Sequence, residues 1–304
     1  MPVRPVVKIG LLASFEGLHR RSGYEVLHAM RGALEDVAAL SDFPTQVVII
    51  PLALDAELNP ARAALKLLAD PDVKAIIGPF DPALVEEVLP ILTTATIPWF
   101  LPMAIDPALG MAPATGSPAW AFSLVRHVAT VAKAQGQQRL VLVGDALGWP
   151  DPANLVTVAS PIPIVDSTGW QGVAGQGITA DDALFWLGRV ESGASYVEAL
   201  RQVYPDVPIW LGPQGGDVLF TELTSQRRQI YWVTWLDDGY QLWAEQIATT
   251  AHPSSLAAYL AYRATEVASA LIINHQVPVE SSWHPQVFML QDDGSSRLLD
   301  PSLE

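Results

Sequence analysis

The chain contains no cysteine among its 304 residues. Disulfide bonds, thiolate metal sites and a cysteine nucleophile are therefore excluded, whereas the compartment stays open because an exported protein need not contain disulfides. Long apolar runs are missing too. No stretch approaches the roughly 18 apolar residues that cross a bilayer, so we expect no membrane insertion. The first residues, MPVRPVVKIG, lead directly into a strand pattern, which indicates either a cytosolic chain or a mature form whose signal peptide has been removed.

Positive charge is scarce. There are 17 Lys and Arg residues against 32 Asp and Glu residues, which gives a net charge of −15 and a pI near 4.7. Such an anionic chain is a poor match for nucleic acid or for an anionic membrane surface. The compact basic cluster His19-Arg20-Arg21 is either a solvated loop or an attractor for an anionic ligand group. Half of the residues are hydrophobic, which is enough for packed cores, and the length suggests two domains of about 150 residues each.

Catalytic and cofactor motifs are lacking as well. The sequence has no G-x-S-x-G elbow, and its glycine-rich GWQGVAGQG fits neither the dinucleotide-binding nor the phosphate-loop spacing. The six histidines are scattered without metal-ligand spacing. Neighbouring residues of an extended chain point to opposite faces, so neither Asp181-Asp182 nor Asp237-Asp238 forms an acid–base couple. We therefore predict no catalytic residue, no metal site and no cofactor, in a protein that is not an enzyme.

Strand and helix patterns alternate along the first part of the chain. Short apolar runs such as VVKIGLL predict strands that are buried on both faces, and apolar residues at helical spacing predict the helices between them. The expected strands are 6–12, 47–52, 75–77 and 97–101, and the expected helices are 22–40, 59–68 and 82–94. This βαβαβαβ order predicts an α/β fold with a parallel sheet covered by helices.

The same alternation resumes after a linker-like stretch, APATGSP, at residues 112–118. We expect helices over 124–134, 195–203 and 256–275, strands over 139–143, 183–187, 208–211 and 230–234, and a hairpin from 287–290 and 297–299. In open parallel sheets, ligands lie beyond the carboxyl ends of the strands. The candidate ligand loops are therefore 13–17, 80–83, 103–106, 145–149, 212–215 and 235–238.

The ordered set of motifs VKIGLLASFEG, VKAIIGPF, IPWFLPMA, RLVLVGDALGW and IWLGPQG resembles the type I periplasmic solute-binding proteins, and among them the branched-chain amino-acid and amide receptors of ABC importers. The resemblance covers most of residues 6 to 275. It implies two doubly wound parallel-sheet lobes joined by a hinge, which close on a small molecule. The expected first lobe is 1–118 plus 240–276, and the second lobe with the hinge is 119–239 plus 277–304.

One segment departs from that family. Residues 166–179, DSTGWQGVAGQGIT, stand where the family has a helix, and they are glycine-rich without helical periodicity. Either the second lobe has lost a helix or this segment is a long loop.

The expected pocket also departs from the family. The resemblance puts Asp81, Pro82 and Ala83 in place of a serine-rich stretch, and Ile105 in place of a threonine. It also puts Gln214 where glutamate is usual and Trp149 where tyrosine is usual. Asp81 would repel a ligand carboxylate, and the Gln214 amide cannot neutralise an ammonium group. We therefore expect a neutral polar, aromatic or cationic ligand rather than an ordinary branched-chain amino acid.

The predicted site combines these positions with their loops and with the aromatic residues near strand ends. The expected ligand-binding residues are Ser14, Phe15, Phe80, Asp81, Ala83, Ala104, Ile105, Trp149, Gln214 and Trp235. The resemblance further implies a monomer that delivers its ligand to the membrane permease of an ABC importer. It implies a periplasmic or extracellular location, with a lipid anchor as an option for the full-length form. The alternatives are a ligand-sensing regulatory module of the same fold, a genuine amino-acid receptor and an enzyme on a doubly wound fold.

Overall fold

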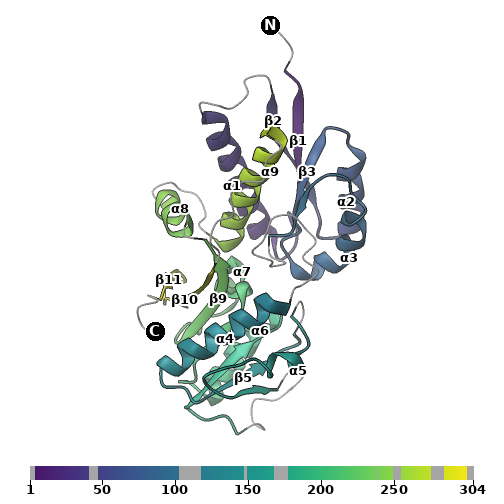
Figure 1. The fold of residues 1–304 in the computed structure, drawn as a ribbon. Helices are drawn as coiled ribbons and strands as arrows, with labels where there is room; N and C mark the ends of the chain where they lie inside the picture. Colours follow the sequence, from purple (N-terminus) through teal and green to yellow (C-terminus); the bar gives the residue numbers. More distant parts are fainter. Residues whose placement is uncertain are drawn as a thin grey trace. The chain divides into compact units, whose positions relative to one another are not determined.

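The computed structural model describes residues 4–40, 47–102, 118–146, 149–167, 177–237, 239–248, 255–274 and 284–299. Within them the chain forms two compact units, each drawn with its own sheet in Figure 1. Unit 1 comprises residues 1–116 and 237–282, and unit 2 comprises residues 117–236 and 283–304. The chain therefore passes between the two units three times.

Unit 1 is built on a parallel sheet with the strand order β2-β1-β3-β4. Its strands are β1 (Val6–Ala13), β2 (Val48–Asp55), β3 (Val73–Ile77) and β4 (Trp99–Phe100). Its helices are α1 (Arg20–Ala39), α2 (Pro60–Ala69), α3 (Pro82–Leu92), α8 (Gly239–Ala248) and α9 (Leu256–Asn274). The last two come from the late part of the chain, and α9 packs against α1 (Figure 1).

Local sequence signals account for several boundaries in unit 1. The side chain of Asn59 accepts the backbone N–H of Arg62 at 2.8 Å, and Pro60 occupies the first turn of α2, as predicted. Helix α3 likewise begins at Pro82. The inner strands β1 and β3 are buried over residues 9–13 and at all positions of β3 except Lys74, and apolar side chains of both strands pack with those of α2 and α3. Burial of these apolar side chains is the main stabilising contribution in this unit.

Close approach of α1 to the end of β1 requires a glycine. A Cβ atom on Gly23 would lie 1.9 Å from the carbonyl oxygen of Ser14, which is far inside van der Waals contact. The absence of a side chain at Gly23 thus lets the first turn of α1 lie directly on the β1–α1 loop.

Helix α9 departs from one expectation. The stretch Leu256–Ile273 is long and apolar enough to cross a membrane by length and composition, although the sequence analysis expected no such stretch. More than half of it is buried inside the structure, which is the behaviour of a core helix, and it carries the charged pair Arg263 and Glu266. Packing against α1 explains why a helix this apolar occurs here.

Unit 2 contains a sheet with the strand order β11-β10-β9-β8-β7-β5-β6. The strands are β5 (Arg139–Val143), β6 (Ile164–Asp166), β7 (Asp182–Trp186), β8 (Ile209–Leu211), β9 (Ile230–Leu236), β10 (His284–Leu290) and β11 (Ser296–Leu298). The first five are parallel, and β10 and β11 form the predicted antiparallel hairpin. The helices are α4 (Pro118–Ala134), α5 (Pro152–Leu155), α6 (Val190–Val203) and α7 (Val218–Leu223), with a 3₁₀ turn, η1, at Pro213–Gly216.

The two mainly parallel sheets with intervening helices confirm the predicted α/β class. The sequence analysis missed β6, α5, α7 and α8. The first three are only three to six residues long, too short for a periodic pattern. Helix α8 begins at Gly239, which the sequence analysis assigned to a turn signal, Asp237-Asp238-Gly239. Of the glycine-rich segment, residues 168–176 lie outside the described residues.

Candidate functional site

In unit 1, the predicted site residues lie at the carboxyl edge of the sheet. Strand β1 ends at Ala13, directly opposite Asp55 at the end of β2. Ser14 is buried, and Phe15 is partly exposed with its backbone N–H donating to Oδ1 of Asp55 at 2.9 Å. Asp55 thus orients the loop that carries both Ser14 and Phe15.

An aromatic pair projects from this loop. The rings of Phe15 and Tyr24 lie edge to face, with centroids 5.4 Å apart, and the guanidinium of Arg20 lies 5.6 Å from the Tyr24 ring centre. Half of the Tyr24 side chain is exposed. The sequence analysis counted Tyr24 only as a helix residue, because its contact with Phe15 depends on the path of the preceding loop.

Asp81 has a histidine neighbour that the sequence pattern did not predict. Its Oδ2 atom lies 3.9 Å from Nε2 of His19, and both side chains are largely buried. The loops after β1 and β3 therefore meet here, and the contact is an ion pair whenever His19 is protonated. Phe80, next to Asp81, is partly buried.

The structure does not describe the side chains of the remaining predicted residues of unit 1. Ala83 belongs to the first turn of α3, but its side chain lies outside the described part of the chain. Ala104 and Ile105 also lie outside the described residues. Their contact with a ligand stays a prediction.

In unit 2, Trp149 and Gln214 come together around Gly212. A Cβ atom on Gly212 would lie 2.6 Å from Cζ2 of Trp149 and 2.6 Å from Oε1 of Gln214. The Trp149 ring meets Phe185 of β7 edge to face at 5.4 Å. These residues follow or end the adjacent strands β5, β7 and β8, so they share the carboxyl edge of the sheet.

The amide of Gln214 has a structural task at this edge. Its Nε2 atom donates to the carbonyl oxygens of Trp186 at 3.2 Å and Gly188 at 3.1 Å. Gln214 thereby joins the loop after β8 to the loop after β7. A glutamate at this position could not make these contacts, because a carboxylate only accepts hydrogen bonds.

A carboxylate that is absent from the predicted ligand-binding residues, although it opens the candidate loop 145–149, lies beside this contact. A Cβ atom on Gly188 would be 2.9 Å from Oδ1 of Asp145 and 2.6 Å from the Trp186 ring. Asp145 itself is exposed. Its place directly after Gly144, at the end of β5, was the available signal. The Trp186 ring stacks on Tyr196 with centroids 4.8 Å apart, and burial raises the pKa of Tyr196, which keeps the phenol neutral.

Trp235 is the remaining predicted residue of unit 2. It is on β9, opposite Pro285 of β10, and its buried indole N–H has no hydrogen-bond acceptor among the residues that the structure describes. Its proposed contact with a ligand therefore stays a prediction.

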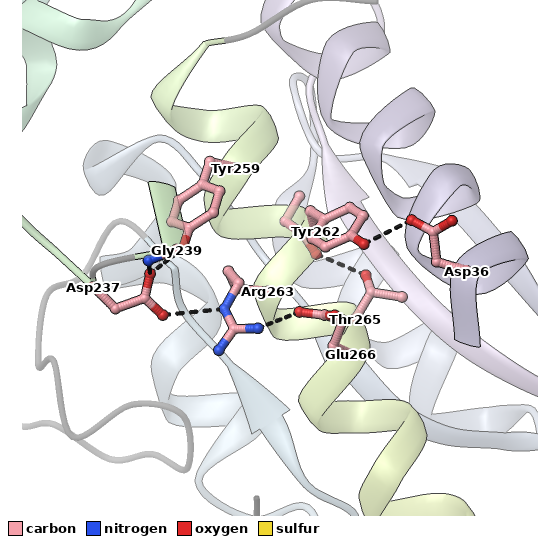
Figure 2. A network of polar contacts seen from close by, with 9 residues as sticks. Asp36, Asp237, Gly239, Tyr259, Tyr262, Arg263, Thr265 and Glu266 are labelled. Carbon is pink, nitrogen blue, oxygen red and sulfur yellow. Dashed lines mark hydrogen bonds and ion pairs between the residues drawn. The ribbon is translucent and has the colours of Figure 1, made fainter. Parts of the chain in front are cut away.

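Unit 1 contains a polar network around Asp237, the residue directly after β9 (Figure 2). The buried carboxylate of Asp237 accepts the hydroxyl of Tyr259 and the backbone N–H of Gly239, and it lies 3.2 Å from Nε of Arg263. It therefore has two hydrogen-bond donors and one cationic ion-pair partner around it, which offset the cost of burying the charge.

The network continues along one face of α9 (Figure 2). Arg263 also pairs with Glu266, and Tyr262 donates to Oδ2 of Asp36 on α1 at 2.7 Å. Burial, reinforced by Asp237, raises the pKa of the Tyr259 hydroxyl, and burial raises the pKa of Glu266. These contacts connect the start of α8 to α9 and connect α9 to α1, so we assign the network a role in stabilising the packing of these helices.

Comparison with known proteins gives matches at the level of structure. Neither a known family model nor a curated protein sequence matches the chain. LivJ of Streptococcus pneumoniae, a branched-chain amino acid transporter substrate-binding protein solved with isoleucine, is 16% identical with a TM-score of 0.66, over 97% of this chain and 100% of that one. The leucine-binding protein LivK of Thermotoga maritima is 15% identical with a TM-score of 0.70, over 97% and 98%.

A third solved structure carries the name of the fold. The periplasmic binding protein type 1 of Bordetella pertussis is 15% identical with a TM-score of 0.66, and the match covers 97% of this chain and 99% of that one. Matches that span nearly all of both chains include the order of the strands and helices in both units. The chain therefore has the fold of the type I periplasmic binding proteins.

Proposed function

We propose that this protein is a non-enzymatic solute receptor that binds a small molecule and delivers it to an ABC importer. The observation that carries the proposal is the match over nearly the full length of both chains to substrate-binding proteins of transporters. The clustering of aromatic and polar residues at the carboxyl edge of each sheet supports it, because open parallel sheets bind ligands there. The corresponding location is periplasmic or extracellular, and the partner is a membrane permease.

The ligand class follows from the charges at these edges. Asp81 directly precedes α3, so it adds a carboxylate next to a helix N-terminus, which would otherwise favour an anion. In unit 2, Gln214 is neutral and its amide nitrogen already donates to two backbone carbonyls. Both features disfavour a free α-amino acid, which needs neutral donors for its carboxylate and an acid for its ammonium group. We therefore favour a neutral polar, aromatic or cationic compound.

A branched-chain amino acid is the second candidate. Solved proteins of this fold are described as complexes with isoleucine or leucine. Their identities to this chain, 16% and 15%, are low enough for the pocket residues to differ while the fold is retained.

Two measurements test the receptor proposal. Native mass spectrometry of protein purified without denaturation is expected to show an adduct below about 500 Da, the size of ligands that such pockets enclose. A thermal-shift screen over amino acids, amides, polyamines and aromatic acids is expected to raise the melting temperature with at least one class, because a ligand that binds only the folded state stabilises it. An unliganded spectrum together with no shift from any class would count against a solute receptor.

A further inference from the structure

We propose that Asp145 and Trp149 form the recognition site for the cationic amine of a ligand that also has an aromatic body. The proposal rests on the receptor function proposed above and names the chemical class of its ligand. It assigns to Asp145 the carboxylate function that Gln214, at the neighbouring strand end, does not provide.

Asp145 carries the negative charge at this edge of the sheet. The carbonyl of Gly188 accepts the Gln214 amide at 3.1 Å, and Oδ1 of Asp145 lies 2.9 Å from where a Gly188 side chain would begin. Asp145 and Gln214 therefore both approach Gly188. An ammonium group bound at this edge would meet the carboxylate of Asp145 instead of a glutamate at position 214.

The second step is the aromatic surface. Trp149 is partly exposed, and its ring is held against Gly212 and edge-on to Phe185. A fixed indole face attracts both planar apolar groups and cations, and tryptophan is the strongest side chain for the cation–π contact. Asp145 and Trp149 together fit an arylalkylamine better than an aliphatic zwitterion.

The third step is the backbone between these two residues. Ala146 has a φ of 54°, in the left-handed region that costs a non-glycine residue about 1 kcal/mol or more. Its carbonyl accepts the N–H of Trp149 at 2.9 Å, which closes the turn. The strained residue directly follows the carboxylate residue Asp145, and strain of this kind is concentrated at ligand sites. The net charge of −15 favours a cationic ligand further.

Calorimetric titration of matched amine and alcohol pairs tests the proposal. The probes are benzylamine, 2-phenylethylamine and tryptamine, each compared with the alcohol of the same carbon skeleton. We expect at least one amine to bind the wild-type chain about tenfold or more tighter than its alcohol, as for a charge-assisted hydrogen bond. In Asp145→Asn that preference is expected to fall to about twofold or less.

Asp151→Asn is the matched control. It removes the same charge six residues away, and asparagine keeps the cap that Asp151 provides to the N–H of Ala153. The amine preference is expected to survive in this variant. Three results would each overturn the assignment. The amine preference could stay unchanged in Asp145→Asn, the wild-type chain could bind amine and alcohol equally, or the preference could be lost in Asp81→Asn instead. If none of the six probes binds while another solute does, the ligand class is wrong but the receptor proposal stands. If no solute binds at all, both proposals fail.

Discussion

Asp182, the first residue of β7, is buried and yet remains charged. Nε and Nη2 of Arg139 contact its two carboxylate oxygens at 2.8 and 2.6 Å, and the N–H of Thr179 donates to it at 2.8 Å. Burial alone raises the pKa of Asp182, but the Arg139 and Thr179 contacts outweigh it and hold the pKa below its usual range. The pair joins β5 to β7 at the edge opposite the candidate site.

The lowered pKa predicts a loss of stability in acid. Because Asp182 is harder to protonate when folded, its contribution is fully present above the unfolded pKa near 3.8 and disappears as the pH falls through the lower folded value. Asp182→Asn is expected to lower the free energy of unfolding by about 2 kcal/mol at pH 7 and by less near pH 3. Urea denaturation at both pH values measures this difference. The exposed neighbour Asp181→Asn is the control, and an equal loss in both variants would contradict the account.

The sequence predicted some residues of the candidate site but not the long-range contacts that they make. Trp149 and Gln214 were predicted from their candidate loops after strands together with the family resemblance, and the structure brings them together at Gly212. The hydrogen bonds of the Gln214 amide were not predictable, because their acceptors lie 28 and 26 residues earlier in the chain. The contact of His19 with Asp81 escaped prediction for the same reason.

At the scale of elements, the packing of α1 on β1 depends on a glycine. Gly23→Ala would put a methyl group 1.9 Å from the Ser14 carbonyl, so α1 or the loop must shift. We expect a loss of at least about 2 kcal/mol in unfolding free energy. Gly32→Ala is the matched control in the same helix, with no atom within 4 Å of the new Cβ, and is expected to stabilise by about 0.5–1 kcal/mol. Chemical denaturation compares the two, and similar effects would show that the close approach is unimportant.

The joint between α8 and α9 depends on Asp237. Asp237→Ala leaves the Arg263 side chain and the Tyr259 hydroxyl without their shared acceptor, so we expect a loss of about 3–5 kcal/mol. Asp36→Ala removes the exposed contact to Tyr262 from the same network and is expected to cost under about 1 kcal/mol. Thermal and urea unfolding of both variants measure the contrast. Comparable losses would mean that the burial of Asp237 has little energetic importance.

Elements differ in how well the sequence predicts them. Helices α1, α2 and α9 have long periodic patterns, and the two inner strands β1 and β3 of unit 1 have continuous apolar runs, so their existence was predicted correctly. Helix α8 depends on Asp237, whose partners Tyr259 and Arg263 come more than 20 residues later. A reading of local sequence therefore took its start for a turn.

At the scale of the whole molecule, the order of strands and helices carries the most information. The alternating pattern predicted an α/β fold, and the resemblance of the ordered motifs implied the periplasmic binding protein type. Matches to solved structures at only 12–17% identity support that fold over nearly the full chain. The order of elements does not identify the ligand, because ligand identity depends on a few side chains at strand ends that can change while the fold is retained.

A ligand is expected to stabilise the whole chain. A compound present at about 100 times its dissociation constant adds about 2.7 kcal/mol to the free energy of unfolding if it binds only the folded state. Urea denaturation with and without a candidate from the thermal-shift screen measures this increase. A compound that shifts the melting temperature without raising the unfolding free energy would not be a ligand of the native state.

Calorimetric titration with leucine, isoleucine and valine at neutral pH tests most directly whether the ligand is something other than a branched-chain amino acid. We predict no binding in the micromolar range for these three amino acids, together with measurable binding of a neutral polar, aromatic or cationic compound from the screen. Asp81 near the start of α3 and the neutral Gln214 are the physical reasons. Low-micromolar binding of any of the three amino acids would contradict the claim that the ligand differs from that of the isoleucine- and leucine-binding proteins of this fold.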